Sequence, residues 1–454
     1  MNFINKHKIE LIVFAIALIL RVILFMINFH IQQGNLVNTI HGDDGYYEIS
    51  QGLINGHGFT GSTIEPFTPN SLRPPVWPFI IALLVWVFGT YWAVLIFQIL
   101  IASFIPVLGI YIARHLIPER YAICVGFLLA LEPYSILLSF ILYTETCFTF
   151  LFLIFLIFLF RYMKEQTIRN AIWSGVFLGL ATLVKPTVQY LPIIIPIIML
   201  YFFRKQLKIS LLKHLLIFLA VFSLLITPWV YRNYKEFGKF GMSAQPAFNL
   251  YVYLVPTVLS YDNHTSFKTE LDTLLKKDSL DVNKINLSNS DYYKNQAFII
   301  LKDHKIAIIK SVAITIVTFF THDGMLTILQ YSGITIENIL DKPAFSLIAH
   351  PTELIKSILH YISSPAILII IMRLFWIIIT ILFFLGIIFN LKTGRQKSIL
   401  LLSIIIVLYF AFTTSINGLG VNARFRIPIN VFIFSFAVYG FYAIKEHIRR
   451  KRII

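Results

Sequence analysis

Residues 41–58 read HGDDGYYEISQGLINGHG, and they follow an apolar run at 9–29. That run is long enough to cross a bilayer, because a spanning helix needs about 20 mostly apolar residues. Two adjacent aspartates, Asp43 and Asp44, come soon after it. A membrane span followed by an acidic pair therefore sets both the fold class and the question of function.

The whole chain has the composition of a polytopic membrane protein. Of its 454 residues, 57% are hydrophobic and only 13% are charged, whereas soluble domains carry about 25% charged residues. The 38 Lys and Arg outnumber the 22 Asp and Glu, which in a membrane protein is typical of cytoplasmic loops and anionic lipid contacts rather than of nucleic-acid binding. The two cysteines lie in apolar runs and argue against a disulfide framework or a structural zinc site.

The apolar segments predict an all-α membrane protein with about ten to twelve spanning helices and juxtamembrane helices on the outer face. Placing every basic patch in the cytoplasm requires an even number of spans between patches, and ten spans satisfy this with both termini cytoplasmic. Two more apolar segments, 76–89 and 306–320, fit re-entrant or interfacial helices. The ten predicted spans are 9–29, 91–114, 121–140, 144–160, 171–185, 187–203, 214–231, 366–390, 398–416 and 427–445.

Two larger segments then lie outside. The first, 30–90, carries the acidic pair; the second, 232–365, includes a polar stretch at 260–293. No tandem repeat and no independent soluble domain is apparent, so residues 1–454 are predicted to form one integral membrane domain.

Charged residues near the span ends share the predicted outer side. A transporter holds its charges nearer the bilayer midplane, whereas mixed charges at the boundary suit an anionic lipid headgroup. Charges inside spans are rare and tend to be functional. The residues on this side are Asp43, Asp44, Arg73, Glu145, Lys185, Arg232, Arg424 and Arg426.

The acidic pair precedes a short amphipathic helix. Tyr46, Ile49 and Leu53 have helical spacing, and Gly56 is a plausible stop. Asp44 then falls at the N-cap, which is an ordinary structural use of aspartate. That use leaves Asp43 unexplained. A carboxylate at a helix N-terminus is held in its charged form, so either aspartate could serve as a base or as a cation ligand.

The basic candidates each have a structural alternative. Arg73 offers a planar fork that matches phosphate oxygens, or it anchors the interface beside Trp77. Lys185 either meets a phosphate or extends toward water from an apolar stretch. Among the acids, Glu145 opens a span and could be structural, whereas Glu132 beside Pro133 fits the satisfaction of freed backbone groups.

A divalent cation could be held by His41, Asp43 and Asp44 through carboxylate oxygens and an imidazole, and THDG at 321–324 is a second candidate. The sequence contains no P-loop, no Rossmann glycine pattern, no HExxH and no evident Ser/His/Asp set. Nothing in it is suited to a nucleotide sugar.

Taken in order, these motifs resemble bacterial members of glycosyltransferase family 39. That family lies in the C-type membrane glycosyltransferase superfamily, together with the protein O-mannosyltransferases and the lipid A aminoarabinose transferase. The resemblance runs from about residue 10 to 445. It rests on the acidic pair after the first span, RPPxxP at 73–78, TE at 144–145, LxKP at 183–186, PWxxRNYxxFG at 228–238 and RFRIP at 424–428.

The resemblance implies an enzyme of the outer face of a membrane, for a bacterium the inner membrane. It implies a polyprenyl-phosphate-linked sugar as donor and a glycolipid, polysaccharide or protein as acceptor. Asp43 matches the base that deprotonates the acceptor hydroxyl, Asp44 its acidic neighbour and Glu145 a second acid of the active site. The donor phosphate would contact Arg73 and Lys185, and further Arg232, Arg424 and Arg426. Relatives differ at the acidic pair and in metal use, so the choice of base and the role of a cation stay open.

Two alternatives remain at this point. A transporter or flippase of a lipid-linked sugar would share the apolar groove and the cations but would not need Asp43. A non-catalytic membrane subunit would use the same charges as interfacial anchors.

Overall fold

The computed structural model describes residues 7–206, 208–277, 284–334, 364–393 and 397–451, with four more positions at 352, 355, 356 and 359. Throughout these residues the regular structure is helical, apart from one isolated bridge between Thr60 and Pro69, so the predicted all-α class is confirmed. Of the predicted outer segment 232–365, residues 278–283, 335–351, 353–354, 357–358 and 360–363 lie outside the described residues, and so do Lys6, Arg395 and Arg452, three basic residues of predicted cytoplasmic segments.

Among the described residues, seven helices are long and apolar enough to span a membrane. This makes the chain an integral membrane protein. A bent pair, α16 and α17, would be an eighth if it counted as one span. The seven are α2 (Lys8–Ile31), α6 (Tyr91–Leu116), α9 (Glu145–Glu165), α12 (Ile209–Phe237), α21 (Ile367–Thr393), α22 (Lys397–Ser415) and α23 (Asn430–Lys451).

The remaining three predicted spans are shorter helices, so length and composition give seven or eight spans rather than ten to twelve. Segment 121–140 is broken into α7 (Glu119–Leu131) and α8 (Pro133–Leu137), because proline lacks the N–H that would continue the helix. Segments 171–185 and 187–203 become α10 (Ile168–Val184) and α11 (Leu191–Phe202), with the one-turn helix η1 (Pro186–Val188) between them.

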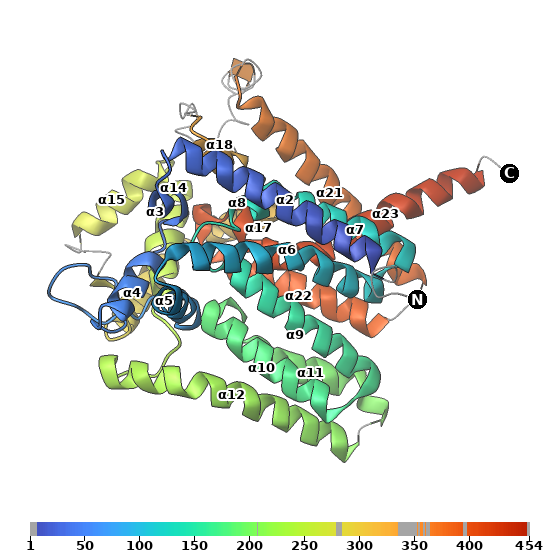
Figure 1. Cartoon of the computed structure of the whole chain (residues 1–454), viewed down its shortest axis with the longest axis horizontal. Helices are drawn as coiled ribbons and strands as arrows, with labels where there is room; N and C mark the ends of the chain where they lie inside the picture. The colour runs from blue at the N-terminus through green and yellow to red at the C-terminus, as the bar shows by residue number, and fades with distance from the viewer. Residues whose placement is uncertain are drawn as a thin grey trace. The chain divides into compact units, whose positions relative to one another are not determined.

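The chain divides into two compact units. Unit 1 comprises residues 1–243, 379–410 and 427–454; unit 2 comprises residues 244–378 and 411–426. In unit 1, α9, α10 and α12 lie side by side, and α2 packs along α6 (Figure 1). Where α21 crosses α23, Gly386 and Gly440 let the backbones touch, since a Cβ on Gly386 would lie 1.8 Å from the carbonyl oxygen of Phe436.

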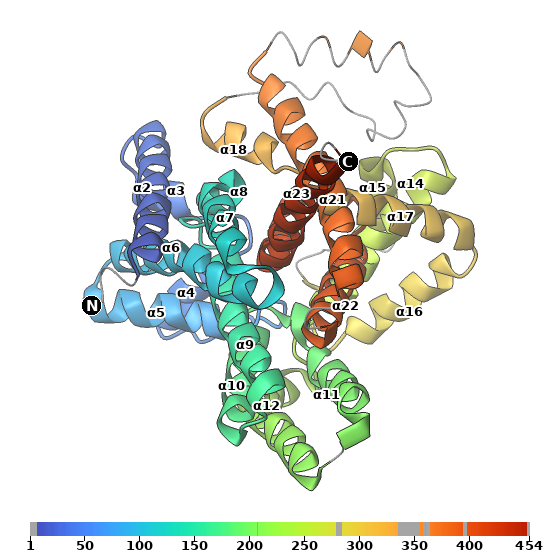
Figure 2. The same ribbon diagram turned by 90° about the vertical axis from the view of Figure 1, so that its right-hand side faces the viewer.

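The first outer segment of unit 1 holds three short helices, α3 (Leu36–Ile40), α4 (Tyr46–Ile54) and α5 (Val76–Phe88). Helices α4 and α5 pack together (Figure 2). The predicted amphipathic helix is confirmed as α4, which buries Tyr46 and Ile49. Its N-cap, however, is Gly45 rather than Asp44, with φ of 75° and no side-chain cap. The predicted N-cap position of Asp44 is therefore wrong.

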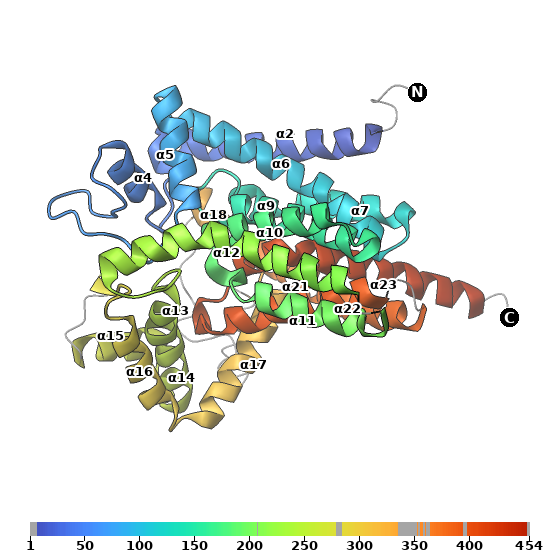
Figure 3. The same ribbon diagram turned by 90° about the horizontal axis from the view of Figure 1, so that it is seen from below.

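Unit 2 contains most of the second outer segment. A π-helical turn, η3 (Asn249–Leu254), leads into α14 (Val255–Asp262), whose buried Val255 and Val258 share a core with Tyr293 and Ala297. The predicted polar stretch forms α15 (Phe267–Lys277) and enters α16 (Ser290–Leu301). Segment 306–320 becomes α17 (Lys305–Thr321), bent by 108° from α16 (Figure 3).

Candidate functional site

The acidic pair sits on a tight turn between two glycines in the left-handed region, Gly42 (φ 69°) and Gly45 (φ 75°). The turn is pressed against residues 141–143. The Leu142 N–H donates to the Ile40 carbonyl at 2.7 Å, and the Asp43 N–H donates to the Tyr143 hydroxyl at 3.3 Å. A Cβ at Gly42 would lie 2.8 Å from Ile141, so this backbone path fixes the aspartates beside the start of α9.

Asp44 forms the first of two ion pairs in unit 1. Its Oδ1 lies 3.2 Å from a guanidinium nitrogen of Arg73, and the two side chains are 16% and 23% exposed. The backbone at Arg73 is held by Asn70, whose Oδ1 accepts the N–H groups of Leu72 and Arg73 at 2.9 and 3.1 Å. The pair thus joins the acidic turn to the segment that starts α5.

Glu145 and Lys185 form the second pair. The Lys185 Nζ lies 2.7 Å from the Glu145 Oε1, with only 1% of the Glu145 side chain exposed. Glu145 is the first residue of α9, and Lys185 directly follows the last residue of α10. Because these two helices pack together, the end of one brings its lysine to the beginning of the other.

Tyr46 links the two ion pairs. Its ring lies 5.5 Å from the Arg73 guanidinium carbon, and its hydroxyl interacts with the side chain of Thr144, next to Glu145 in the chain. Burial, followed by the charges of Asp44 and Glu145, raises the pKa of Tyr46, which keeps the phenol neutral. The structure therefore gathers four predicted site residues, Asp44, Arg73, Glu145 and Lys185, around one tyrosine.

The sequence did not single out Tyr46 for a role beyond the apolar face of α4. A signal was available, since the hydroxyl is the only polar group among the three positions that define that face. A buried tyrosine hydroxyl usually finds a partner, and the nearest chemistry along the chain is the acidic pair.

Asp43 differs from its neighbour. Its side chain is exposed, and no ion pair to it occurs within the described part of the chain. Three carboxylates (Asp43, Asp44 and Glu145) and two cations (Arg73 and Lys185) give the group a formal charge of −1. Each cation already faces a carboxylate, so Asp43 supplies the excess negative charge.

Arg232 belongs to the same unit but contacts the backbone. One guanidinium nitrogen lies 2.9 Å from the Asn70 carbonyl oxygen and 2.9 Å from the Asn233 Oδ1. The rings of Phe59 and Trp229 lie 5.5 and 4.9 Å from its guanidinium carbon. Arg232 therefore braces the loop that carries Asn70 and Arg73.

Arg424 and Arg426 lie in unit 2. Arg426 is completely buried, donates to the carbonyl oxygens of Phe319 and His322 at 2.8 and 2.7 Å, and stacks 3.5 Å from the Trp376 ring. These contacts argue against the phosphate role expected of Arg426, because its donors already face backbone carbonyls. Arg424 is only partly buried, with its guanidinium 5.2 Å from the Phe425 ring.

The metal candidates do not form a three-ligand group. Across the residues that the structure describes, no three His, Cys, Asp or Glu side chains are placed to hold one ion. The His41 Nε2 instead lies 2.7 Å from the Glu48 Oε1. In THDG, the Asp323 Oδ2 accepts from the Arg373 Nε at 2.6 Å.

Two further charged residues, Glu132 and Arg21, are buried in the interior of unit 1. Glu132 caps α8 and accepts the N–H groups of Tyr134 and Ser135 at 3.3 and 2.6 Å, which supports the structural interpretation of its place beside Pro133. Arg21, which the sequence reasoning missed, is buried in the middle of α2. A single arginine within a long apolar run was the signal that could have identified it.

With this geometry in place, the chain can be compared with known proteins. Residues 72–231 match the family model described as dolichyl-phosphate-mannose-protein mannosyltransferase. No curated protein matches the sequence. Among solved structures, the apo oligosaccharyltransferase of Archaeoglobus fulgidus matches with a TM-score of 0.51 and 13% identity, over 100% of this chain and 52% of that chain.

The C-type membrane glycosyltransferase fold is confirmed. The archaeal oligosaccharyltransferase AglB from the same organism, in complex with an inhibitory peptide and a dolichol-phosphate, matches at a TM-score of 0.51 and 12% identity, covering 100% of this chain and 52% of that one. The form tethered to an acceptor peptide with the NVT sequon matches at 0.51 and 14%, covering 100% and 51%. The chain thus spans about half the length of these structures. Together with the family match, they bear out the resemblance that the motifs carry.

Proposed function

We propose that the chain is a membrane glycosyltransferase that transfers a sugar from a polyprenyl-phosphate donor to an acceptor hydroxyl. The observation that carries this proposal is the linked pair of ion pairs in unit 1, Asp44–Arg73 and Glu145–Lys185, with an additional exposed carboxylate on Asp43. Glycosyl transfer needs a base for the acceptor and positive charge for the departing phosphate. The family match and the fold support the same reaction class.

Asp43 is the better candidate for the base. Asp44 is bound to Arg73 at 3.2 Å, and a carboxylate that faces a guanidinium is a weaker proton acceptor. Asp43 is exposed and lies on the same rigid turn. Its carboxylate could therefore approach an acceptor hydroxyl without first breaking an ion pair.

Arg73 and Lys185 are the proposed phosphate contacts. Both side chains retain some exposure, 23% and 17%, so an incoming phosphate could share each cation with its present carboxylate. The positive charge would then be arranged before the donor arrives, which lowers the reorganisation needed when the phosphate leaves. Glu145 would hold Lys185 in place, and Arg232 would support the Arg73 loop through Asn70.

The site is proposed to face the outer side of the membrane. In unit 1 the charged group lies where α9 begins and α10 ends, whereas Lys164 and Arg169 lie at the opposite ends of the same helices. Because basic residues favour the cytoplasmic side, the charged group would lie outside and both termini inside. In a bacterium the membrane would be the inner membrane.

The proposed partners follow from the same chemistry. The prenyl chain of the donor would lie in the membrane among apolar helices, and its phosphate would reach Arg73 and Lys185. The acceptor would be a glycolipid, polysaccharide or protein that presents a hydroxyl on the outer face. The sugar is proposed to be a hexose or a pentose.

The test is a transfer assay with purified protein, radiolabelled polyprenyl-phosphate hexose or pentose, and a membrane glycolipid extract or hydroxyl peptide. Asp43→Asn should lower transfer by about a thousandfold, within the range of positioned acid–base catalysis, and leave donor binding and Tm unchanged. Asp44→Asn should also weaken donor binding, because it releases Arg73. Glu65→Gln, an exposed carboxylate of the same outer segment, is the matched control and should retain activity.

Transfer by Asp43→Asn at the wild-type rate would reject Asp43 as the base. A flippase of a lipid-linked sugar remains the competing function. It predicts movement of labelled donor between the leaflets of liposomes that survives Asp43→Asn, without a new glycosylated product from any acceptor.

A further inference from the structure

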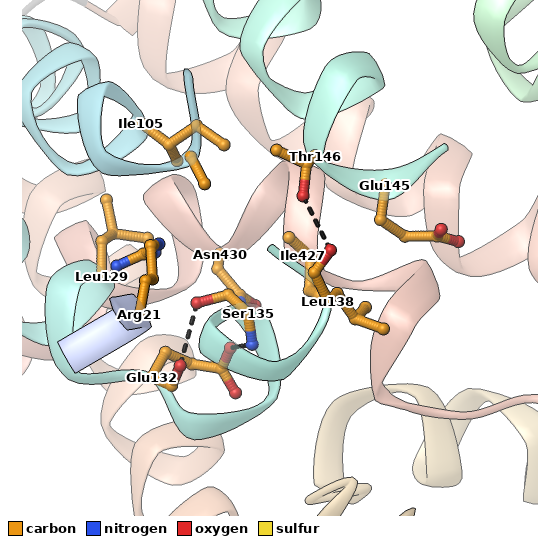
Figure 4. A pocket seen from close by; sticks show the side chains of 11 residues that line it. Arg21, Ile105, Leu129, Glu132, Ser135, Leu138, Glu145, Thr146, Ile427 and Asn430 are labelled. Carbon is orange, nitrogen blue, oxygen red and sulfur yellow. Dashed lines mark hydrogen bonds between the residues drawn. The ribbon is translucent and has the colours of Figure 1, made fainter. Parts of the chain in front are cut away.

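A small cavity with both polar and apolar lining lies inside unit 1, and Asp43 is not among the residues that line it. It is lined by polar side chains of α2, of the α7–α8 break and of α23, and by the apolar Ala102, Ile105 and Leu129. Figure 4 shows Arg21 and Glu132 at one end, with Ser135 and Asn430 beside them. Glu145 lies at the other end, and its carboxylate points away from Arg21 in this view.

Arg21 lines this cavity, and its Nε–H group has no hydrogen-bond partner within the described residues. It has 13 helical residues before it and ten after it in α2, and only 1% of it is exposed. One guanidinium nitrogen donates to the Ala17 carbonyl at 2.9 Å. A buried guanidinium in an apolar bundle needs both a counter-charge and acceptors for its N–H groups.

The counter-charge is Glu132, which is 4% exposed and is the group that interacts electrostatically with Arg21. Its carboxylate accepts hydrogen bonds from the N–H groups of Tyr134 and Ser135, whereas Arg21 donates to a carbonyl of its own helix. The two charges therefore face one cavity while each is anchored to its own backbone.

The space between them has the size of a single water molecule. The volume of the cavity that water can occupy is about 20 Å³. A buried water molecule needs about 10–15 Å³ of such volume and two to four polar partners. A sugar or a phosphate is too large for it. Arg21 Nε supplies a donor, and the Glu132 carboxylate and the Ser135 hydroxyl supply acceptors.

We propose that this cavity binds one ordered water molecule, which accepts a hydrogen bond from Arg21 Nε and donates one to Glu132, so that the two residues form a water-bridged ion pair within the membrane. The pair would hold α8 against α2. Helix α8 is also tied to the start of α9, because the carbonyl of Leu138, directly after α8, accepts from the Thr146 Oγ1 at 3.1 Å. Arg21 would thus be a positioning residue for Glu145, a consequence that rests on the proposed function.

The structural part is tested by cryo-electron microscopy of the full chain in lipid nanodiscs, at a resolution that shows ordered waters. We expect one density within hydrogen-bond distance of Arg21 Nε and of a Glu132 oxygen. A cavity without density, or an Arg21 Nε bonded directly to Glu132, would overturn the proposal.

Charge removal tests the ion pair. Arg21→Met should lower Tm by on the order of 10 °C, because it leaves Glu132 buried without its counter-charge. The double variant Arg21→Met/Glu132→Gln should recover at least half of that loss. The matched control is Glu10→Gln, which removes another α2 ion pair, at 2.8 Å to Arg114, and should cause less than half the shift. Additive losses in the double variant would contradict the pairing.

Filling the cavity tests the water. Ala102 lines the cavity, whereas Ala113 lies on the same helix, α6, is equally buried and does not line the cavity. Ala113→Val is therefore the matched control for Ala102→Val. If a bound water bridges the charges, Ala102→Val should displace it and lower Tm at least as much as Ala113→Val. If the cavity is dry, Ala102→Val should instead raise Tm, because it fills empty apolar space.

The proposed role of Arg21 in positioning Glu145 is tested by measuring kcat. Arg21→Gln, compared at a temperature where it stays folded, should lower kcat about tenfold with the donor KM unchanged, and Arg21→Lys should recover part of the loss. An Arg21→Gln enzyme of lower Tm but wild-type kcat would reject the positioning role. If the wild type itself shows no transfer, the proposed function fails, whereas the density and the Tm series still decide the water-bridged pair.

Discussion

Arginines in the two units have opposite surroundings. In unit 1, Arg73 faces a carboxylate at 3.2 Å and keeps 23% of its side chain exposed. In unit 2, Arg426 is completely buried, with its guanidinium against two backbone carbonyls and the Trp376 ring. Both follow from similar sequence signals, a basic residue close to a helix start. The contrast shows that the partners and the exposure of an arginine determine what it can bind. Neither can be read from the order of motifs along the sequence.

The largest effect on stability is expected from Arg426→Met. The substitution would strip the Phe319 and His322 carbonyls of charged donors in a buried site, at a cost of about 3 kcal/mol. Thermal unfolding followed in detergent should show this loss. The matched variant Arg73→Met should cost about 1 kcal/mol or less, because that pair is partly exposed. Equal losses would erase the distinction between the two arginines.

The Glu145–Lys185 pair should fall between these cases. Lys185→Met leaves Glu145, only 1% exposed, without its ammonium, which we expect to cost about 2–3 kcal/mol. Adding Glu145→Gln should recover part of the stability but none of the transfer activity. A double variant with wild-type activity would show that this pair is only structural.

Tyr46→Phe should have a smaller effect, about 1 kcal/mol, because it removes one hydroxyl and keeps the ring beside Arg73. Thr144→Val removes the polar group that interacts with the Tyr46 hydroxyl, so the two changes should be non-additive in a double-mutant cycle. The neighbouring Tyr47→Phe is the control. Additive losses would mean that Tyr46 does not connect the two ion pairs through Thr144.

The smallest expected effect concerns pH and unit 2. Burial, and then the charge of Arg373, lowers the pKa of His322 to about 4 from 6.5. Between these values the unfolded chain binds a proton that the folded chain does not, so stability falls as the pH drops. We expect a loss of about 1 kcal/mol between pH 7 and pH 5.5. His322→Gln should flatten this dependence in thermal scans, and an unchanged dependence would exclude His322 as its source.

Sequence patterning predicted the helical class and singled out most of the charged residues that the structure pairs, because both depend on local signals. Long apolar runs made the spans evident, and Asp44, Arg73, Glu145 and Lys185 were identified from their positions at helix ends. The structure adds which acid meets which base, because pairing depends on how α9 packs on α10. The predicted span 121–140 failed because Pro133 cuts an apolar run that hydropathy alone treats as continuous, whereas the break at Pro186 was predicted.

Arg21 and Tyr46 escaped for a different reason. Each interacts with a partner that is distant in sequence: Arg21 with Glu132, and Tyr46 with Thr144. No spacing rule links a residue of the first helix to one near position 130. The burial of Arg426 could not be predicted either, because only the folded chain places its guanidinium against Phe319 and His322.

The turn at Gly42 has a genetic consequence. Any side chain there would adopt a strained φ of 69° and would press on Ile141, only 2.8 Å from the new Cβ. Gly42→Ala would leave every ionisable group in place while loosening the backbone that carries Asp43. It should therefore yield a temperature-sensitive allele, active in cool cultures and silent in warm ones, with which the cellular product of this protein can be switched off on demand.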